Sequence, residues 1–293
     1  MDLLSIDHLS DAQIALLLER ALKFHGQAGK TFDSLQGRIV FNLFYENSTR
    51  TLMSFATAAH RLGATAITLP VSQSSVNKGE TLDDTARTLD AMKPDALIIR
   101  HRENGAAAGV ALIMDAPVIN AGDGTNEHPT QALLDAATLR KHFGDLSGLK
   151  VAICGDIRHS RVAHSNALLL PRLGAEVRLA GPPELMPDGI ERLSVDEAIE
   201  GADAIMMLRV QRERLEQDLG DAPGEYLARY GLTADRLAKA APNAVIMHPG
   251  PMNRGVEIAG AIADDPQRSL ITLQVAMGVA TRMACLEAVI EAA

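Results

Sequence analysis

The stretch from Arg38 to Leu69, RIVFNLFYENSTRTLMSFATAAHRLGATAITL, decides the fold class of the chain. Its first seven residues, RIVFNLF, are apolar and partly β-branched, which predicts a buried strand. The loop YENS leads into TRTLMSFATAAHRLG, a predicted helix that ends at Gly63, and residues 64–69 predict a second strand. A strand, a helix and a second strand in this order form a right-handed βαβ unit with parallel strands.

The same alternation continues outward along the chain and then starts again. Periodic apolar residues predict helices over 10–24, 81–92, 106–114, 130–142, 160–173, 194–200 and 270–291. Short apolar runs predict strands over 95–99, 117–120, 150–154, 176–180, 203–208 and 244–247. The two runs meet near residues 143–148, so we expect two α/β domains with doubly wound parallel sheets, over 1–142 and 148–293.

The composition excludes several classes of partner. The chain has 293 residues, 47% of them hydrophobic, which suits two domains with packed cores. It carries 28 Lys and Arg against 37 Asp and Glu, a formal charge of −9. Nucleic acids and anionic membranes are bound by a basic surplus, and with 3% aromatic residues and no Trp the chain also lacks stacking platforms for bases.

The expected compartment is the cytoplasm. The two cysteines, Cys154 and Cys285, are too few for a disulfide framework, and the first residues lack the basic and apolar regions of a signal peptide. We also expect no transmembrane span, since no uninterrupted apolar stretch reaches the necessary length.

Ligands of open α/β sheets bind beyond the carboxyl ends of the strands. The first strand delivers Ser48, Thr49, Arg50 and Thr51 onto the start of a helix, where free backbone N–H groups, hydroxyls and a guanidinium suit a phosphate. An ordinary Ser or Thr cap beside a solvent-facing arginine explains these residues equally well on spacing alone.

Other predicted strand ends also carry cations or neutral donors. These residues are Arg100, His128 with Gln131, Arg161 after Ser160, and Arg209 with Gln211. One arginine in such a place is usually a surface residue or half of an ion pair. Several of them in an acidic chain indicate a small ligand with more than one negative charge.

Other templates for chemistry are absent from the sequence. There is no G-x-x-x-x-G-K-[ST] phosphate loop, and Gly122-x-Gly124 lacks the third glycine of a dinucleotide-binding motif. His159 and His164 lie on one segment without the further ligands of a metal site. Cys154, inside an apolar strand, is expected to be a small core residue rather than a nucleophile.

Seven segments together resemble the aspartate branch of the aspartate/ornithine carbamoyltransferase family. In chain order they are FYENSTRT, SVNKGET, IIRH, HPTQALLD, SRVAHSN, LRVQRERL and HPGPMNRGVEI. The first and HPTQ mark the wider family, whereas Lys78, Arg209-x-Gln211 and His248-Pro-Gly-Pro resemble the aspartate branch. The ornithine branch would be expected to show an H-C-L-P segment, and this chain has no cysteine there.

The resemblance implies a carbamoyl-phosphate domain followed by an aspartate domain, with the final helix returning to the first. Carbamoyl phosphate would be held by Ser48, Thr49, Arg50, Thr51, Arg100, His128, Gln131, Gly250 and Pro251. L-Aspartate would be held by Lys78, Arg161, Arg209 and Gln211. The implied catalytic residues are Arg50, Thr51, Lys78, Arg100, His128 and Gln131. The product, N-carbamoyl-L-aspartate, would serve an early step of pyrimidine biosynthesis.

The resemblance further implies a homotrimer, because Lys78 and Ser74 or Ser75 lie on a loop that reaches a neighbouring subunit's site in the family. Glu46, Arg161 and Arg214 match residues that bridge the domains on closure. No cofactor and no metal are implied. A larger assembly with regulatory chains or a dihydroorotase-like partner is compatible with the resemblance.

The chain departs from the family pattern at Leu52 and Ala56, where relatives often carry a basic residue and a glutamate. These positions are i and i+4 on one predicted helix, so an apolar pair replaces an ion pair worth about 0.3–0.5 kcal/mol at an exposed site. We expect no loss of activity from this change. Two alternatives stay open: a carbamoyltransferase for another amine, and a non-catalytic paralogue that binds anions.

Overall fold

A computed structural model of the chain describes residues 1–71, 79–190, 193–210 and 223–292. The chain forms two compact units: unit 1 comprises residues 1–137 and 275–293, and unit 2 comprises residues 138–274. The division falls inside α5 (Pro129–Phe143), whereas the sequence-based boundary lies just after that helix.

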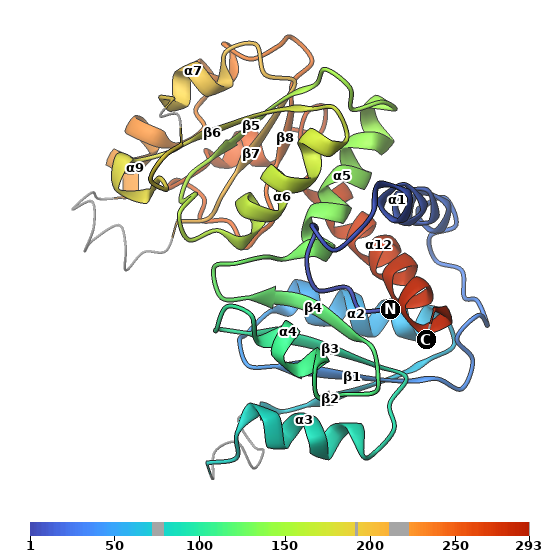
Figure 1. The fold of residues 1–293 in the computed structure, drawn as a ribbon. Helices are drawn as coiled ribbons and strands as arrows, with labels where there is room; N and C mark the ends of the chain where they lie inside the picture. Colours follow the sequence, from blue (N-terminus) through green and yellow to red (C-terminus); the bar gives the residue numbers. More distant parts are fainter. Residues whose placement is uncertain (72–78, 191–192, 211–222, 293) are drawn as a thin grey trace. The chain divides into compact units, whose positions relative to one another are not determined.

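Unit 1 contains a parallel sheet with the strand order β2-β1-β3-β4 (Figure 1). Its strands are β1 (Ile39–Phe44), β2 (Thr65–Leu69), β3 (Ala96–His101) and β4 (Val118–Asp123). Its helices, besides most of α5, are α1 (Asp11–His25), α2 (Thr49–Arg61), α3 (Leu82–Asp90), α4 (Ala106–Ala111) and most of α12 (Ile271–Glu291).

Helices cover the unit 1 sheet on both faces, as a doubly wound sheet requires. Phe41 and Leu43 of β1 share one core cluster with residues of α3 and α4. Val40 directly precedes Phe41 in the strand and is also buried, so its side chain faces the opposite layer, which contains α2. The near-continuous apolar sequence of β1 follows from this burial on both faces.

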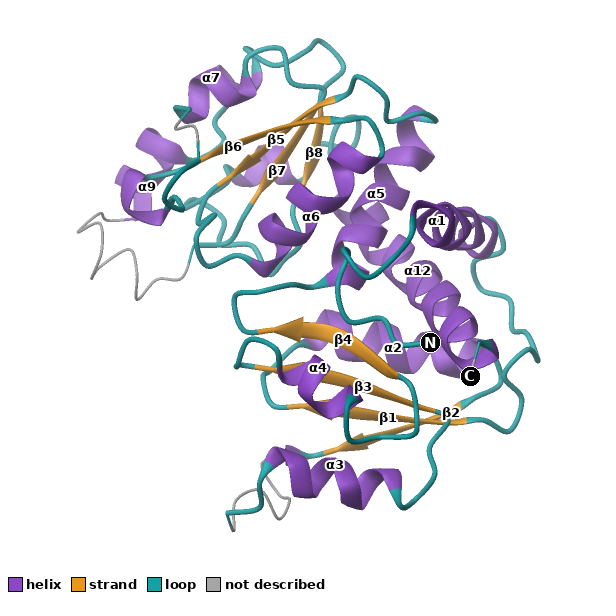
Figure 2. Cartoon of the chain, viewed as in Figure 1, coloured by secondary structure: helices purple, strands orange, loops and turns teal. Residues whose placement is uncertain are grey.

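Unit 2 repeats the architecture with the strand order β6-β5-β7-β8, again parallel (Figure 2). Its strands are β5 (Lys150–Cys154), β6 (Glu176–Ala180), β7 (Ala204–Met207) and β8 (Val245–Met247). Its helical segments are α6 (Arg161–Arg172), η3 (Pro183–Leu185), α7 (Val195–Ile199), α9 (Pro223–Tyr230), α10 (Ala234–Leu237) and α11 (Gly260–Ala263). The predicted α/β class with two parallel sheets is therefore confirmed.

Several of the predicted helix starts coincide with side-chain caps. Ser10 and Gln13 form a reciprocal capping box at α1, and Ser194 and Glu197 form another at α7. The Thr81 side chain accepts from the backbone N–H of Asp84 at the start of α3. These caps satisfy N–H groups that have no partner within the helix.

The final helix α12 packs into unit 1, as expected from the resemblance. Its Arg282 guanidinium lies 5.1 Å from the ring centroid of Phe55 in α2. The expectation that no segment could span a membrane was too strong: α12 is long and apolar enough by composition, although 72% of its apolar window is buried inside the protein. A helix that is apolar all round is also what the core of a globular domain requires, and here α12 is a core element.

Candidate active site

The strand register of unit 1 brings three carboxyl ends to one edge of the sheet. Phe44 at the end of β1 pairs with Arg100 of β3, and His101 pairs with Asp123 at the end of β4. Strand β3 extends to His101. Arg100 therefore lies inside the strand, whereas the sequence predicted that it directly follows the strand. The segments that follow β1 and β4 therefore both start beside Arg100.

The start of α2 is free of the ordinary side-chain cap. Ser48 is the N-cap residue with an extended backbone, yet its side chain makes no capping hydrogen bond. Thr49 and Arg50 are exposed. The first N–H groups of the helix and the Ser48 hydroxyl are thus available to an anion, which favours the phosphate interpretation over the cap alone.

Thr51 and His128 meet at this edge although 77 residues separate them in sequence. The Thr51 Oγ1 atom lies 3.4 Å from His128 Nε2, and both side chains are buried. Thr51 belongs to the first turn of α2, and His128 directly precedes α5. The predicted convergence of these two residues is present.

Arg100 is held in a fixed orientation beside them. Its Nη1 donates to the carbonyl oxygen of Ala121 at 3.2 Å, and its Nε lies 3.2 Å from Glu46 Oε2. Its side chain is only 14% exposed, so an anion that reaches it is poorly screened by water. Glu46 thus pairs within unit 1; the predicted role of Glu46 and Arg161 in bridging the domains stays a prediction.

A buried carboxylate shapes the loop that leads to His128. Asp123 Oδ1 accepts from Asn120 Nδ2 and from the backbone N–H of Glu127, at 2.8 and 3.2 Å. Asp123 Oδ2 accepts from the N–H of Gly105 and from Asn126 Nδ2, at 2.7 and 3.1 Å. Four donors on one buried acid keep the loop in a single conformation and place the histidine.

Gly124 allows this loop to approach the one after β3. Its φ is +51°, and a Cβ there would lie 1.9 Å from Asn104 Oδ1. The glycine that the sequence left without a nucleotide-binding role therefore serves close packing of two loops.

The neighbour of Arg100, His101, is buried and neutral. Its Nδ1 accepts from the backbone N–H of Glu103 at 3.1 Å, and its ring packs edge-on to Tyr45. Burial lowers the pKa of His101, with Arg102 acting in the same direction and Glu103 and Glu46 opposing it.

This shift predicts a loss of stability in acid. The unfolded chain binds a proton on His101 at about pH 6.5, whereas the folded protein binds it only at lower pH, so the free energy of unfolding falls as pH drops through that window. Denaturant unfolding at pH 7.5 and 5.5 should show a smaller decrease for His101→Asn, whose amide oxygen replaces the Nδ1 acceptor. Equal decreases in both proteins would show that His101 titrates normally.

Gln131 lies in the first turn of α5 beside the same edge. Its Nε2 donates to Asp135 Oδ1 at 3.0 Å, and both side chains are buried.

Leu52 and Ala56 are half-buried on α2 rather than exposed, so the apolar pair gains some burial in place of the weak ion pair.

The candidates of unit 2 lie at the corresponding edge of its sheet. Ser160 is an ordinary N-cap whose side chain accepts from the Ala163 N–H at 3.1 Å, and Arg161 is the first residue of α6. Arg209 follows β7 and is exposed. Lys78 and Gln211, together with Ser74, Ser75 and Arg214, lie outside the described residues.

The segment after β8 is held by His248, a buried histidine that the sequence placed in a family motif but to which it gave no role. The Gly250 N–H donates to His248 Nδ1 at 2.8 Å, so Nε2 carries the proton that faces Glu257 Oε1 at 3.1 Å. The peptide bond between Gly250 and Pro251 is cis. His248 and Glu257 thereby fix the predicted Gly250 and Pro251 region.

Asp123 and Glu257 are supporting residues that sequence reasoning missed, and Glu46, which the resemblance assigned to domain closure, was not expected to pair with Arg100. Their only signal was an acid next to a strand end or inside a glycine-rich segment, which also describes many solvated surface acids. Glu46 pairs with a residue of another strand, whereas Asp123 and Glu257 accept mostly from donors of their own segments, and the sequence alone shows neither pairing.

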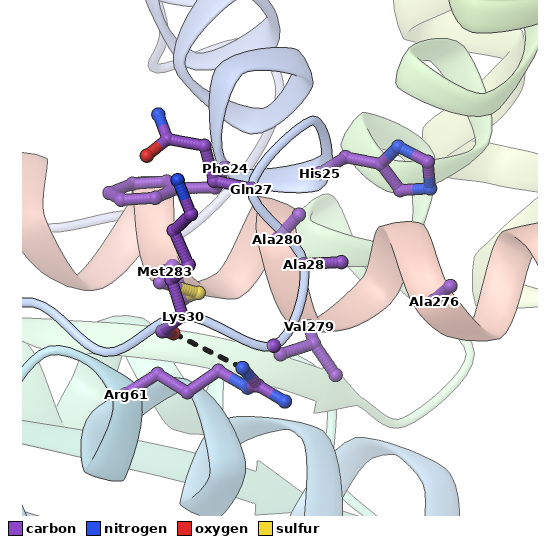
Figure 3. Close-up of a pocket in the computed structure, with 11 residues that line it drawn as sticks. Phe24, His25, Gln27, Ala28, Lys30, Arg61, Ala276, Val279, Ala280 and Met283 are labelled. Atoms are coloured by element: carbon purple, nitrogen blue, oxygen red, sulfur yellow. Dashed lines mark hydrogen bonds between the residues drawn. The ribbon is translucent and has the colours of Figure 1, made fainter.

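A cavity elsewhere in unit 1 is distinct from this site. It has a volume of about 160 Å³ and lies between the end of α1, the end of α2 and the α12 helix (Figure 3). Phe24, Val279 and Met283 contribute apolar walls, and Arg61 donates to the Lys30 carbonyl at 3.1 Å. None of the predicted site residues lines it.

Cysteine and metal chemistry find no support in the described residues. Cys154 is fully buried, and burial raises the pKa of its thiol to about 12, so it is the core residue that the sequence predicted. Within the described ranges, no three His, Cys, Asp or Glu side chains come together as a possible metal site.

Two family models match the chain. "Aspartate/ornithine carbamoyltransferase, carbamoyl-P binding domain" covers residues 1–141, and "Aspartate/ornithine carbamoyltransferase, Asp/Orn binding domain" covers residues 147–289. Among curated relatives, the aspartate carbamoyltransferase catalytic subunit of Granulibacter bethesdensis is 56% identical over 98% of this chain and 93% of its own length. The same subunit of Rhodospirillum rubrum is 54% identical, covering 97% and 92%.

Solved structures of both branches resemble the chain. Trypanosoma cruzi aspartate transcarbamoylase in complex with N-(phosphonacetyl)-L-aspartic acid is 33% identical with a TM-score of 0.87, covering 98% of this chain and 94% of that one. Pyrococcus furiosus ornithine carbamoyltransferase is 29% identical with a TM-score of 0.86, covering 97% and 95%. The backbone alone therefore does not distinguish the two acceptors.

Proposed function

The chain belongs to the aspartate/ornithine carbamoyltransferase family, and from this premise we propose that it transfers the carbamoyl group of carbamoyl phosphate to the amine of L-aspartate. The products are N-carbamoyl-L-aspartate and phosphate, and the reaction serves pyrimidine biosynthesis. The observation that carries the proposal is the contact between Thr51 and His128 beside Arg100, at the sheet edge where α2 begins.

The phosphate of carbamoyl phosphate binds at the start of α2. Ser48, Thr49 and Thr51 offer hydroxyls. Arg50 offers a guanidinium that forms no ion pair with the described residues. The helix dipole and the first N–H groups add to the same attraction. This subsite neutralises the leaving group before the carbon–oxygen bond breaks.

The carbamoyl oxygen binds where Arg100, His128 and Thr51 converge. The deprotonated aspartate amine attacks the carbamoyl carbon, and the carbonyl oxygen becomes an oxyanion that these fixed donors stabilise. The oxyanion then collapses, the bond to phosphate breaks, and the nitrogen loses its proton, which the departing phosphate can accept. His128 is assigned as a donor to the oxygen and not as the general base.

The carbamoyl NH2 group binds Gln131 and the backbone carbonyls near Pro249 and Gly250. Binding both substrates in fixed positions lowers the barrier further, because the reacting atoms meet without a loss of translational freedom in the transition state.

The aspartate carboxylates bind Arg161 and Arg209, with Gln211 and Lys78 assisting. Arg209→Ala should raise KM for aspartate at least tenfold and leave KM for carbamoyl phosphate unchanged, because one charge-assisted hydrogen bond contributes about 1.5–3 kcal/mol. The measurement is steady-state kinetics with each substrate varied in turn. Unchanged aspartate KM would mean that Arg209 does not contact the acceptor.

A carbamoyltransferase for ornithine is the second candidate, favoured only by the equal backbone similarity to the Pyrococcus furiosus enzyme. An equimolar mixture of aspartate and ornithine with carbamoyl phosphate distinguishes the two, with the carbamoylated products separated by mass. We expect carbamoyl aspartate alone. Carbamoyl ornithine as the main product would overturn the acceptor assignment and leave the phosphate subsite intact.

We further propose a cytoplasmic homotrimer with shared active sites. The resemblance of SVNKGET to the loop that enters a neighbour's site supports the trimer, and the two free, buried cysteines suit a reducing compartment. A larger assembly with regulatory chains or a dihydroorotase-like partner stays a prediction.

Mixed trimers test the shared sites. At a carbamoyl phosphate concentration below the wild-type KM, where the Lys78→Ala and Arg50→Ala proteins each have little activity, the two should regain part of the activity after they are dissociated and reassembled together, because some sites then receive neither change. Each variant reassembled alone is the control. Without any regain, both residues serve the site of their own subunit.

A further inference from the structure

A buried acid stands directly behind one of the proposed substrate contacts. Asp135 is 0% exposed and lies one helical turn after Gln131 on α5. Its Oδ1 accepts a hydrogen bond from Gln131 Nε2 at 3.0 Å. The mechanism above gives this acid no role, and burial of a carboxylate is costly unless something compensates it.

The carboxylate decides which end of the Gln131 amide faces the site. An ionised carboxylate only accepts hydrogen bonds, so the amide nitrogen must face Asp135 and Oε1 must point away from it. Oε1 is an acceptor, which is what the N–H groups of a carbamoyl NH2 need. With the amide reversed, its own N–H groups would oppose those of the substrate.

A buried arginine compensates the charge of Asp135. Arg282 of α12 is 3% exposed, and the charge of Asp135, after that of Cys285, raises the pKa of its guanidinium against the effect of burial. Burial lowers the pKa of Arg282 to about 10, which still leaves the guanidinium charged at neutral pH. Its Nη1 donates to the Gly278 carbonyl at 3.2 Å, and its Cζ lies over the Phe55 ring, 5.1 Å from the centroid.

The helix α12 has a glycine where this arginine needs room. A Cβ at Gly278 would lie 2.8 Å from Arg282 Nη1 and 3.4 Å from Leu134 Cδ2. Glycine in a helix interior costs about 1 kcal/mol relative to alanine, so its presence here is consistent with space kept for the buried cation.

We propose that Asp135 is a positioning residue of carbamoyl transfer, which holds the Gln131 amide with its oxygen toward the carbamoyl NH2, and that Arg282 keeps Asp135 ionised. The inference rests on the proposed function. It adds a requirement that no substrate contact reveals: a charge pair in the core of unit 1 sets the polarity of one hydrogen bond in the site.

The test is Asp135→Asn, which preserves the shape and removes the charge. The new amide can donate to Gln131 Oε1 and so allows the Gln131 amide to reverse. We expect kcat/KM for carbamoyl phosphate to fall about tenfold, as for a buried donor that loses its acceptor. Competitive inhibition by inorganic phosphate should be unchanged, because the start of α2 binds it.

Glu287→Gln is the matched control. Glu287 is another buried acid of unit 1 that pairs with an arginine, Arg20, and it has no contact with Gln131 among the recorded hydrogen bonds of the described residues. The same chemical change at Glu287 should lower the melting temperature. It should leave kcat/KM for carbamoyl phosphate and the inhibition constant of inorganic phosphate as in the wild type. Equal kinetics of Asp135→Asn and Glu287→Gln would overturn the inference.

A double-mutant cycle with Gln131→Ala shows whether Asp135 acts through Gln131. In the Gln131→Ala background, Asp135→Asn should cost nothing further in kcat/KM, whereas a purely structural role predicts additive losses. If Asp135→Asn fails to fold, Asp135→Asn with Arg282→Met removes both buried charges together and serves in its place. If the wild-type protein shows no turnover, the proposed function itself is refuted. If the wild-type protein is active and Asp135→Asn has the same kcat/KM, this inference alone is refuted.

Discussion

Replacing Arg100 by alanine is expected to lower kcat about a hundredfold or more with carbamoyl phosphate and aspartate saturating. The guanidinium is oriented by the Ala121 carbonyl and by Glu46 before any substrate binds, so it stabilises the developing oxyanion without reorganising. Removing one such preorganised donor costs about 3–4 kcal/mol of barrier. Stopped-time measurement of phosphate and carbamoyl aspartate gives kcat directly.

Two further variants separate this effect from charge and folding. Arg100→Lys keeps the charge but loses the planar fork that reaches both Ala121 and the substrate, and it should recover only a small part of the rate. Arg102→Ala, two residues along and exposed, should keep kcat within a factor of two. A loss of less than threefold for Arg100→Ala would place Arg100 outside the oxyanion site.

Replacing Arg50 by alanine is expected to weaken phosphate and carbamoyl phosphate binding about ten- to hundredfold. Its guanidinium is exposed at the start of α2, so a charge-assisted hydrogen bond to the phosphate is lost while the folded core is untouched. Titration calorimetry with inorganic phosphate measures the affinity, and thermal unfolding should give nearly the wild-type melting temperature.

The other end of the same helix supplies the control for Arg50. Arg61 lies in the last turn of α2 and donates to the Lys30 carbonyl. Arg61→Ala should leave phosphate affinity unchanged, although it removes the same charge from the same helix. If both variants lost affinity equally, a general field effect and not a direct contact would explain the result.

The sequence predicted most of the architecture because the strands are short, apolar and regularly spaced. Strands β5 and β6 have the predicted bounds, and α12 begins within one residue of its predicted start. The short helices η3, α10 and α11 were not predicted, because a segment of three or four residues is too short to show a helical period. Strands β3 and β4 run further than predicted because His101 and Asp123 pair across the sheet.

The candidate site was predictable as a set of strand ends and not as a network. The order of motifs placed Thr51, Arg100 and His128 at carboxyl ends of strands, and the parallel register brings those ends together. What supports these residues was not predictable: the contacts of Glu46 with Arg100, of Asp123 with the loop before His128, and of Asp135 with Gln131 follow only from the three-dimensional structure. Lys78 and Gln211 lie outside the described residues, so their roles rest on the resemblance.

Aspartate-dependent phosphate release tests the central claim most directly. Purified protein is incubated with carbamoyl phosphate, with aspartate present, absent or replaced by ornithine, and phosphate and carbamoyl product are measured together. The account predicts one carbamoyl aspartate for each phosphate released, and only background hydrolysis in the other two reactions. Phosphate release that does not depend on aspartate, or no release with it, would contradict the account.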